Sequence, residues 1–301
     1  MMDKVLFTLG PTAVGKTDIS ITLAKKFDGE IISCDSVQIF KGLDIGSAKV
    51  KKEEMKNVPH HLIDIVSPNE SFTAFDMTEA IKEKIGVIYA RNHLPIVVGG
   101  TSLYVKSLIL NYNYGGVGVD EEYRKELKEI LEKEGTEKLA KMLEKEDKDA
   151  FEKIDKHNPQ RLIRALEIAR FKGEKKTDEK IIDPLVFALV LDRQKLYERI
   201  NKRVDMMLES GLVDEVKSLL DNGVKKDSQS MHAIGYKEVI AYLDNEISYE
   251  RMVELIKQHS RNYAKRQLTF LRGMEDVNYV DVENKKEISS MEEKITRWLN
   301  G

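Results

Sequence analysis

Residues 10–17, GPTAVGKT, have the pattern of a phosphate-binding loop. Their spacing is G-x-x-x-x-G-K-[ST], in which backbone amides surround a phosphate chain, the lysine neutralises charge and the last hydroxyl can bind Mg²⁺. An apolar run, KVLFTL, precedes the loop and a segment with helical spacing follows it, which is the order that anion binding requires. We therefore expect a phosphate chain on the loop residues, with Thr17 as a metal ligand: Gly10, Pro11, Thr12, Ala13, Val14, Gly15, Lys16 and Thr17.

Asp35 is the acidic residue best placed to act beside that phosphate chain. It follows the apolar run EIISC, and strand ends of this kind face the ligand crevice of a doubly wound sheet. A phosphate hydrolase needs a second carboxylate, but the strand suited to carry it ends in VVGGT, with two glycines and Thr101. We therefore expect Asp35 to take a proton from an acceptor while the phosphates leave. The dipeptide DS also begins helices and turns, so a capping role fits the spacing equally well.

Composition limits the classes of partner. Charged residues make up 34% of the 301 residues and the net charge is -3, so a nucleic-acid site must be a local basic patch. A single cysteine, Cys34, excludes an intrachain disulfide and suits a reducing compartment. No apolar segment approaches membrane-spanning length, and the first residues have no signal-peptide layout. We expect a cytoplasmic protein without a membrane partner.

Four short apolar runs predict the strands of a buried parallel sheet: KVLFTLG, GEIISCD, LPIVVGG and PLVFALVLD. Between the third and the fourth run, mixed charges alternate with apolar residues at helical spacing. The predicted fold is α/β, a P-loop NTPase-like parallel sheet flanked by helices, with an all-helical insertion. Residues 1–114 form the first part of the core, 115–182 the insertion, and 183–301 the second part of the core with the C-terminal helices.

Seven segments, in this order, resemble one family, the tRNA dimethylallyltransferases or tRNA isopentenyltransferases: GPTAVGKT, SCDSVQIFKGLDIGSAK, PHHLID, VGGTSLY, NPQRLIRALEI, AIGYKE and AKRQLTFLR. The resemblance implies transfer of a dimethylallyl group from dimethylallyl diphosphate to the exocyclic N6 amine of the adenosine 3′ of the anticodon, in tRNAs that read codons beginning with U. It implies Mg²⁺ as the cofactor and the tRNA anticodon stem-loop as the partner. We expect the protein to act as a monomer.

The resemblance also implies roles for individual residues. Asp35 becomes the general base, Thr101 the residue at the target nucleotide and Lys16 the cation at the leaving diphosphate, which lies on the loop 10–17. The insertion becomes the tRNA-binding domain. The implied tRNA contacts are Asp35, Ser36, Val37, Gln38, Thr101, Arg124, Gln160, Arg161, Leu162, Ile163 and Arg164.

Several of these residues also fit purely structural roles. Thr101 could cap the helix SLYVKSL, and Asn158 before a proline is a good helix start. The basic side chains Arg161 and Arg164 lie three residues apart and share a helix face, which suits contact with RNA phosphates. Arg124 lies in a segment with many charged residues, and only the resemblance implies its role in tRNA binding.

The stretch SRNYAKRQLTFLR carries four basic residues and no acidic one, so it is either a solvated helix face or a phosphate-binding patch. We assign Tyr263 and Phe270, in the same stretch, to the core. His232 stands where family members often carry an arginine or glutamine. Arg193 or Arg203 could supply positive charge to the diphosphate instead.

Other functions share these motifs. A small-molecule or nucleotide kinase has the same phosphate loop, and would consume ATP. An enzyme that prenylates free adenylate would not need the long insertion or NPQRLIR. A nucleotide-gated binding protein would bind a partner without forming a product.

Overall fold

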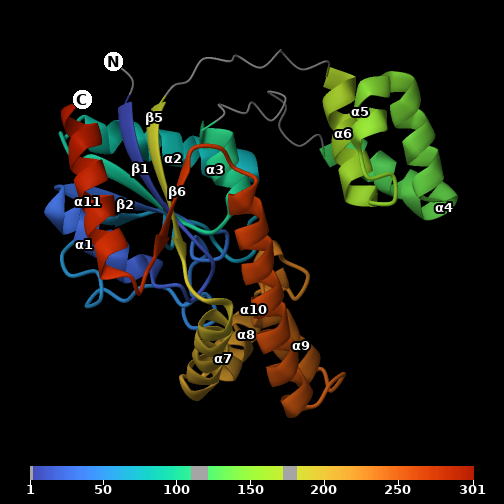
Figure 1. Cartoon of the computed structure of the whole chain (residues 1–301). Coiled ribbons are helices and arrows are strands. Elements are labelled where there is room, and N and C mark those ends of the chain that lie inside the picture. Colours follow the sequence, from blue (N-terminus) through green and yellow to red (C-terminus); the bar gives the residue numbers. More distant parts are fainter. Residues whose placement is uncertain (1–2, 110–120, 172–181) are drawn as a thin grey trace. The chain divides into compact units, whose positions relative to one another are not determined.

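The computed structural model describes residues 3–109, 121–171 and 182–301, which form two compact units (Figure 1). The first unit comprises residues 1–109 and 180–301, and the second comprises residues 110–179. The predicted domain boundaries after residues 114 and 182 fall in or beside the undescribed segments and stay predictions. Each unit is described here by itself.

A six-stranded parallel sheet forms the centre of the first unit, with the order β3-β2-β4-β1-β5-β6. The four apolar runs form β1, β2, β4 and β5, so the predicted α/β sheet is confirmed. The two outer strands were not predicted, because β3 has only two residues and β6 has five. The strands are β1 (Asp3–Leu9), β2 (Gly29–Cys34), β3 (His60–His61), β4 (Leu94–Gly99), β5 (Ile182–Val190) and β6 (Val277–Asp281).

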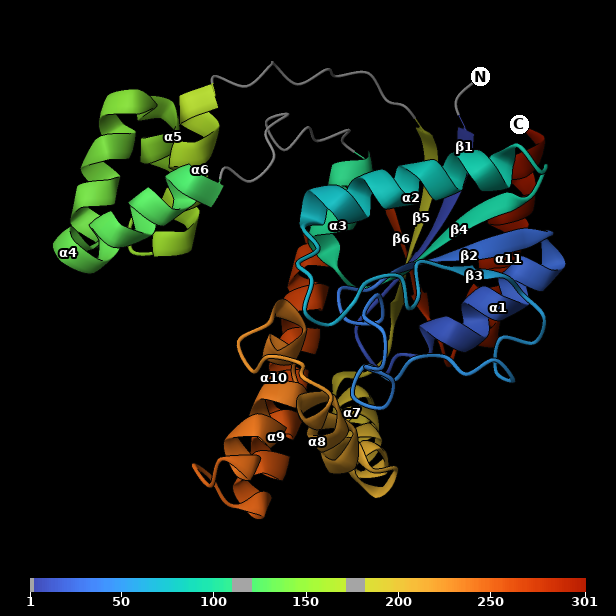
Figure 2. The same cartoon turned by 180° about the vertical axis from the view of Figure 1, so that it is seen from behind.

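Helices cover both faces of the sheet, which explains why its strands are apolar throughout (Figures 1 and 2). Helices α2 (Ala74–Tyr89) and α3 (Ser102–Ile109) pack on the face of Phe7. Helices α1 (Lys16–Lys26) and α11 (Lys285–Asn300) pack on the opposite face, which carries Leu6. Adjacent residues of a strand point to opposite faces, and both Leu6 and Phe7 are fully buried. The two cores therefore share one sheet.

The chain after β5 forms a helical group that extends away from the sheet (Figure 1). Its last member, α10, runs back to α3 and so returns to the loops at one edge of the sheet. None of the described helices combines the length and the hydropathy that crossing a bilayer requires. The group consists of α7 (Arg193–Glu209), α8 (Leu212–Asp221), the short η1 (Gln229–His232), α9 (Tyr236–Leu243) and α10 (Tyr249–Arg272).

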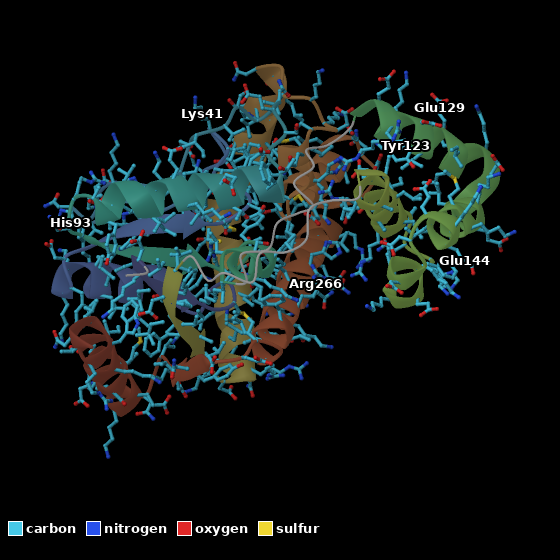
Figure 3. The ribbon with its side chains drawn as sticks, turned by 90° about the horizontal axis from the view of Figure 1, so that it is seen from above. Lys41, His93, Tyr123, Glu129, Glu144 and Arg266 are labelled. Atoms are coloured by element: carbon cyan, nitrogen blue, oxygen red, sulfur yellow. The ribbon has the colours of Figure 1, made fainter. Side chains whose placement is uncertain are left out.

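The described part of the second unit is helical, as expected for the insertion: α4 (Glu121–Glu146), α5 (Lys148–Lys153) and α6 (Pro159–Phe171). Leucines at helical spacing form its small separate core, which includes Leu127, Leu139 and Leu166. The charges that dominate its sequence lie on the outside of these helices, as Figure 3 shows for Glu129 and Glu144.

A carboxylate from α8 holds the loop that follows β2. The Oε2 atom of Glu215 accepts the backbone N–H groups of Asp44 at 3.0 Å and Ile45 at 2.7 Å. Its Oε1 accepts the N–H of Gly46 at 3.1 Å and the phenol of Tyr236 at 2.8 Å. The Tyr236 ring is fully buried, and it fills the space where a side chain at Gly46 would begin. One side chain therefore satisfies three loop amides and joins them to the C-terminal helices.

We expect Glu215→Ala to lower the free energy of unfolding by about 2–4 kcal/mol, because it leaves amide and phenol donors without an acceptor. Urea titration of the two proteins measures the difference. Asp214→Ala, an exposed change on the same helix, is the control and should stay within about 0.5 kcal/mol of the parent. Equal stability of the two variants would contradict this role of Glu215.

Candidate functional site

Three loops leave the sheet side by side at one edge. The strands β2, β4 and β1 are neighbours, and Gly99 of β4 is in register with both Cys34 of β2 and Leu9 of β1. The next residue of each strand therefore begins a loop at the same level: the phosphate loop, the turn at Asp35, and the segment that contains Thr101. The parallel sheet thus brings together the sequence-predicted residues of the first unit.

The phosphate loop has the conformation that its glycines allow. Gly15 precedes α1 with φ 101° and ψ 25°, a left-handed geometry that side-chain-bearing residues rarely adopt. The ammonium group of Lys16 folds over the loop and donates to the carbonyls of Gly10 at 3.0 Å and Pro11 at 2.7 Å. Thr17 is exposed in the first turn of α1. The N-terminus of α1 and the lysine therefore offer positive charge at the same point.

Positive charge exceeds negative charge near this loop. Burial and, to a smaller extent, the positive charge of Arg203 lower the pKa of Lys16 to about 8, against the opposing effect of the Asp35 carboxylate. Burial also lowers the pKa of Arg203, again opposed by Asp35. Arg203 is therefore the residue that supplies the second cation. Arg193 instead is exposed and donates to the Tyr197 phenol at 3.3 Å. Two partly buried cations beside one carboxylate favour binding of an anion.

Asp35 has the capping role that its spacing allowed. Its Oδ1 accepts the backbone N–H groups of Val37 at 2.8 Å and Gln38 at 3.3 Å, so one oxygen caps the turn. Across the described ranges, no residue donates a hydrogen bond to Oδ2. Gln38 is fixed as well, because its Oε1 accepts from Ser33 at 3.1 Å. Ser36 is partly exposed, like the rest of this turn. The turn therefore holds one carboxylate oxygen ready for a ligand.

Thr101 does not cap α3 through its side chain. Its Oγ1 is buried and forms no well-made hydrogen bond within the described part of the chain, although the phenol of Tyr263 lies beside it. Tyr263 was assigned to the core, but the structure places it at this site. Burial, followed by the nearby charge of Asp35, raises its pKa to about 12. The sequence did not indicate this position, because a tyrosine among apolar residues at helical spacing fits the core equally well.

The oxygen ligands near the loop suit Mg²⁺. Within residues 3–109, 121–171 and 182–301, no group of three or more His, Cys, Asp or Glu side chains could hold a metal. Mg²⁺ is instead commonly bound by one or two protein oxygens, several waters and the phosphates of a substrate. The exposed hydroxyl of Thr17 fits that kind of binding, in which the metal arrives with a diphosphate.

In the second unit, two predicted RNA-binding arginines share one carboxylate. Glu167 of α6 is fully buried. Arg124 of α4 donates to both of its oxygens, from Nε at 2.7 Å and from Nη2 at 2.9 Å. Arg164 donates from Nη1 to Oε2 at 3.0 Å. Glu167, which sequence reasoning missed, therefore fixes the orientation of both guanidinium groups.

The remaining predicted residues of α6 divide by exposure. Leu162 is fully buried and Ile163 is 6% exposed, so their side chains belong to the core of the second unit. Gln160 and Arg161 are exposed. Asn158 caps the helix, since its Oδ1 accepts the backbone N–H of Arg161 at 3.2 Å. The side chains of this segment that a ligand could reach are therefore those of its exposed first turn and the partly exposed Arg164.

The basic stretch lies on α10 of the first unit. Lys265 and Arg266 are exposed, and together with Phe270 they line a shallow surface depression. Figure 3 labels Arg266 on this helix. Phe270 is partly exposed there, which corrects its assignment to the core. Arg261 is directed elsewhere and donates to Oδ1 of Asn201 on α7 at 2.6 Å. The patch that can meet a polyanion is thus smaller than the sequence suggested.

Known proteins resemble this chain over nearly its whole length. A tRNA dimethylallyltransferase of Bacillus anthracis is 43% identical over 99% of this chain and 96% of its own length. The crystal structure of a tRNA isopentenylpyrophosphate transferase from Bacillus halodurans has a TM-score of 0.76 and 43% identity, covering 99% of this chain and 97% of the other. The corresponding enzyme of Staphylococcus epidermidis has a TM-score of 0.71 and 41% identity, with 99% of each chain covered.

A eukaryotic dimethylallyltransferase acting on tRNA has the same fold, with a TM-score of 0.79, 30% identity and coverage of 93% of this chain and 74% of its own. The family model described as IPP transferase matches residues 38–274. The phosphate loop and Asp35 precede that range, but the matches to the relatives cover 99% of the chain. The chain belongs to the IPP transferase family, whose members include the tRNA dimethylallyltransferases.

Proposed function

We propose that this protein transfers a dimethylallyl group from dimethylallyl diphosphate to the N6 amine of the adenosine 3′ of the anticodon, in tRNAs that read codons beginning with U. The observation that carries this proposal is the meeting of Lys16, Arg203 and Asp35 beside the phosphate loop. The two cations suit a leaving diphosphate, and the carboxylate has an oxygen available for a proton. We place the reaction in the cytoplasm, with a monomer as the active species.

The reaction divides its work among these groups. The diphosphate binds to the loop amides, Lys16 and Arg203, which stabilise the negative charge that grows as it leaves. The amine nitrogen forms a bond to the allylic carbon while the bond from that carbon to the diphosphate oxygen breaks. The nitrogen then carries an extra proton, which Asp35 takes through Oδ2. The products are the N6-prenylated adenosine and diphosphate.

We propose Mg²⁺ as the cofactor, held by Thr17 together with the diphosphate. When bound, it would neutralise part of the charge on the diphosphate. Thr101 and Tyr263 then border the side of the site next to Asp35, and we propose that they contact the adenosine after it has left the base stack.

Each unit offers basic side chains to the tRNA. In the second unit these are the arginine pair Arg124 and Arg164, with the exposed Gln160 and Arg161. In the first unit they are Lys265 and Arg266 on α10. Contacts of this kind with phosphates position an RNA, whereas contacts with base edges select its sequence.

The base assignment predicts that Asp35→Asn lowers the rate of prenyl transfer at saturating substrates by about 10²- to 10⁴-fold. Mass spectrometry of nucleosides, after incubation with Mg²⁺, dimethylallyl diphosphate and unmodified tRNA, measures the product. Asp28→Asn, with an exposed side chain at the start of β2, is the matched control and should be fully active. Near-normal transfer by Asp35→Asn would remove Asp35 as the base, and transfer of label from the terminal phosphate of ATP would favour a kinase.

For Glu167→Gln we expect about a tenfold weaker binding of the cognate anticodon stem-loop, because Arg124 and Arg164 lose their common carboxylate. The loss of one negative charge would by itself strengthen binding to RNA. Weaker binding would therefore indicate that Glu167 acts by orienting the arginines, and stronger binding that only the net charge matters. Filter binding with cognate and unrelated stem-loops gives the affinities. Glu152→Gln, an exposed change on α5, is the control. Tighter cognate binding by Glu167→Gln would contradict the orienting role.

Replacing Lys265 by alanine should weaken tRNA binding similarly for all tRNA sequences. It should also reduce the slope of log K against log salt concentration by about 0.7–0.9, the change expected for one lost phosphate contact. Binding measured at several salt concentrations provides this slope. The exposed Lys286 on α11 offers a matched Lys286→Ala control, which should keep the slope of the parent. An unchanged slope for Lys265→Ala would mean that α10 is merely a solvated face.

A further inference from the structure

We propose that Gln267 of α10 is a positioning residue that couples the phosphate loop to the loop carrying Thr101. In this role it fixes the distance between the prenyl donor and the adenosine, and so controls the rate of transfer rather than the binding of either substrate. The proposal rests on the proposed function and concerns the geometry of that same site.

A single amide group spans the two loops. The Oε1 of Gln267 accepts the backbone N–H of Thr12, in the phosphate loop, at 2.9 Å. Its Nε2 donates to the carbonyl of Gly100, in the neighbouring loop, at 3.1 Å. These partners lie 255 and 167 residues away along the chain. Because both bonds use one planar group, neither loop can shift without changing the other bond.

The contact is buried and closely packed. Gln267 is 4% exposed, so water cannot readily replace either hydrogen bond. A Cβ atom at Gly100 would lie 1.9 Å from Nε2, which means that the loop approaches this amide as closely as a backbone can. The amide of Thr12 is occupied by this bond rather than directed at a phosphate. Gln267 therefore shapes the phosphate loop without belonging to its anion-binding surface.

The same face of α10 also reaches the predicted adenosine side of the site. Tyr263 precedes Gln267 by four residues, so the two side chains share a helix face. Its phenol lies beside the buried hydroxyl of Thr101, the residue that follows Gly100. One rigid helix thus contacts the loop of the donor and the loop of the acceptor. A displacement of about 1 Å between reactants can cost about 10²-fold in rate, which makes such a link matter for catalysis.

Two variants separate positioning from binding. Gln267→Met keeps the approximate length and the burial but loses both hydrogen bonds, and Gln267→Asn keeps donor and acceptor but is one methylene too short to span both loops. The exposed Gln258 on the same helix offers a matched control, Gln258→Met. Each protein is compared in kcat, in KM for tRNA and for dimethylallyl diphosphate, in affinity for inorganic pyrophosphate by calorimetry, and in thermal midpoint.

We expect Gln267→Met to lower kcat by about 100-fold, with both KM values and the pyrophosphate affinity within about threefold of the parent. Gln267→Asn should show the same pattern with a smaller loss, and Gln258→Met should match the parent. If one Gln267 variant does not fold, the other still decides the question. Normal kcat in a folded variant, or a loss confined to pyrophosphate affinity, would overturn the proposal. Absence of transfer by the parent protein would instead refute the proposed function.

Discussion

The register of three parallel strands is the constraint on which the site depends. Gly99 of β4 aligns with both Leu9 and Cys34, so the three strands end in one row. Everything that follows that row is a loop, and each loop would be free to adopt many conformations if the sheet alone held it. The sheet determines which loops are neighbours, but it does not fix the distances between them. Those distances come from polar side chains on helices that the chain forms much later.

The sheet and the phosphate loop could be predicted because both have strong local signals. Four apolar runs gave four strands, and one short motif, GPTAVGKT, gave a loop with a lysine over its carbonyls. Single residues that act across the fold have no such signal. Glu215 and Glu167 look like ordinary charges on amphipathic helices, and only their hydrogen bonds to specific donors show what they do. Tyr263 was misassigned for the same reason, since an aromatic residue at helical spacing fits the core equally well.

Carboxylates and amides that are buried or partly buried lie in this protein where backbone or guanidinium groups need a fixed direction. Glu215 holds three loop amides, Glu167 holds two arginines, and Gln267 joins two loops. Each is costly to bury unless every polar atom is satisfied, and each is satisfied by the group that it orients. The same arrangement explains why the basic residues of the second unit stay close together despite the like charges of Arg124 and Arg164.

The first unit is discontinuous in sequence, and this has a consequence for how the protein is made. The phosphate loop leaves the ribosome before the side chain that anchors Thr12, which follows 255 residues later. Until Gln267 has been synthesised, the loop lacks this hydrogen bond. The sheet is likewise incomplete until β5 and β6 have been synthesised. A chain released early, before α10 is complete, keeps the whole motif GPTAVGKT and yet lacks the fixed loop geometry. The motif and the side chain that fixes the geometry of its loop are thus separated by 255 residues of chain.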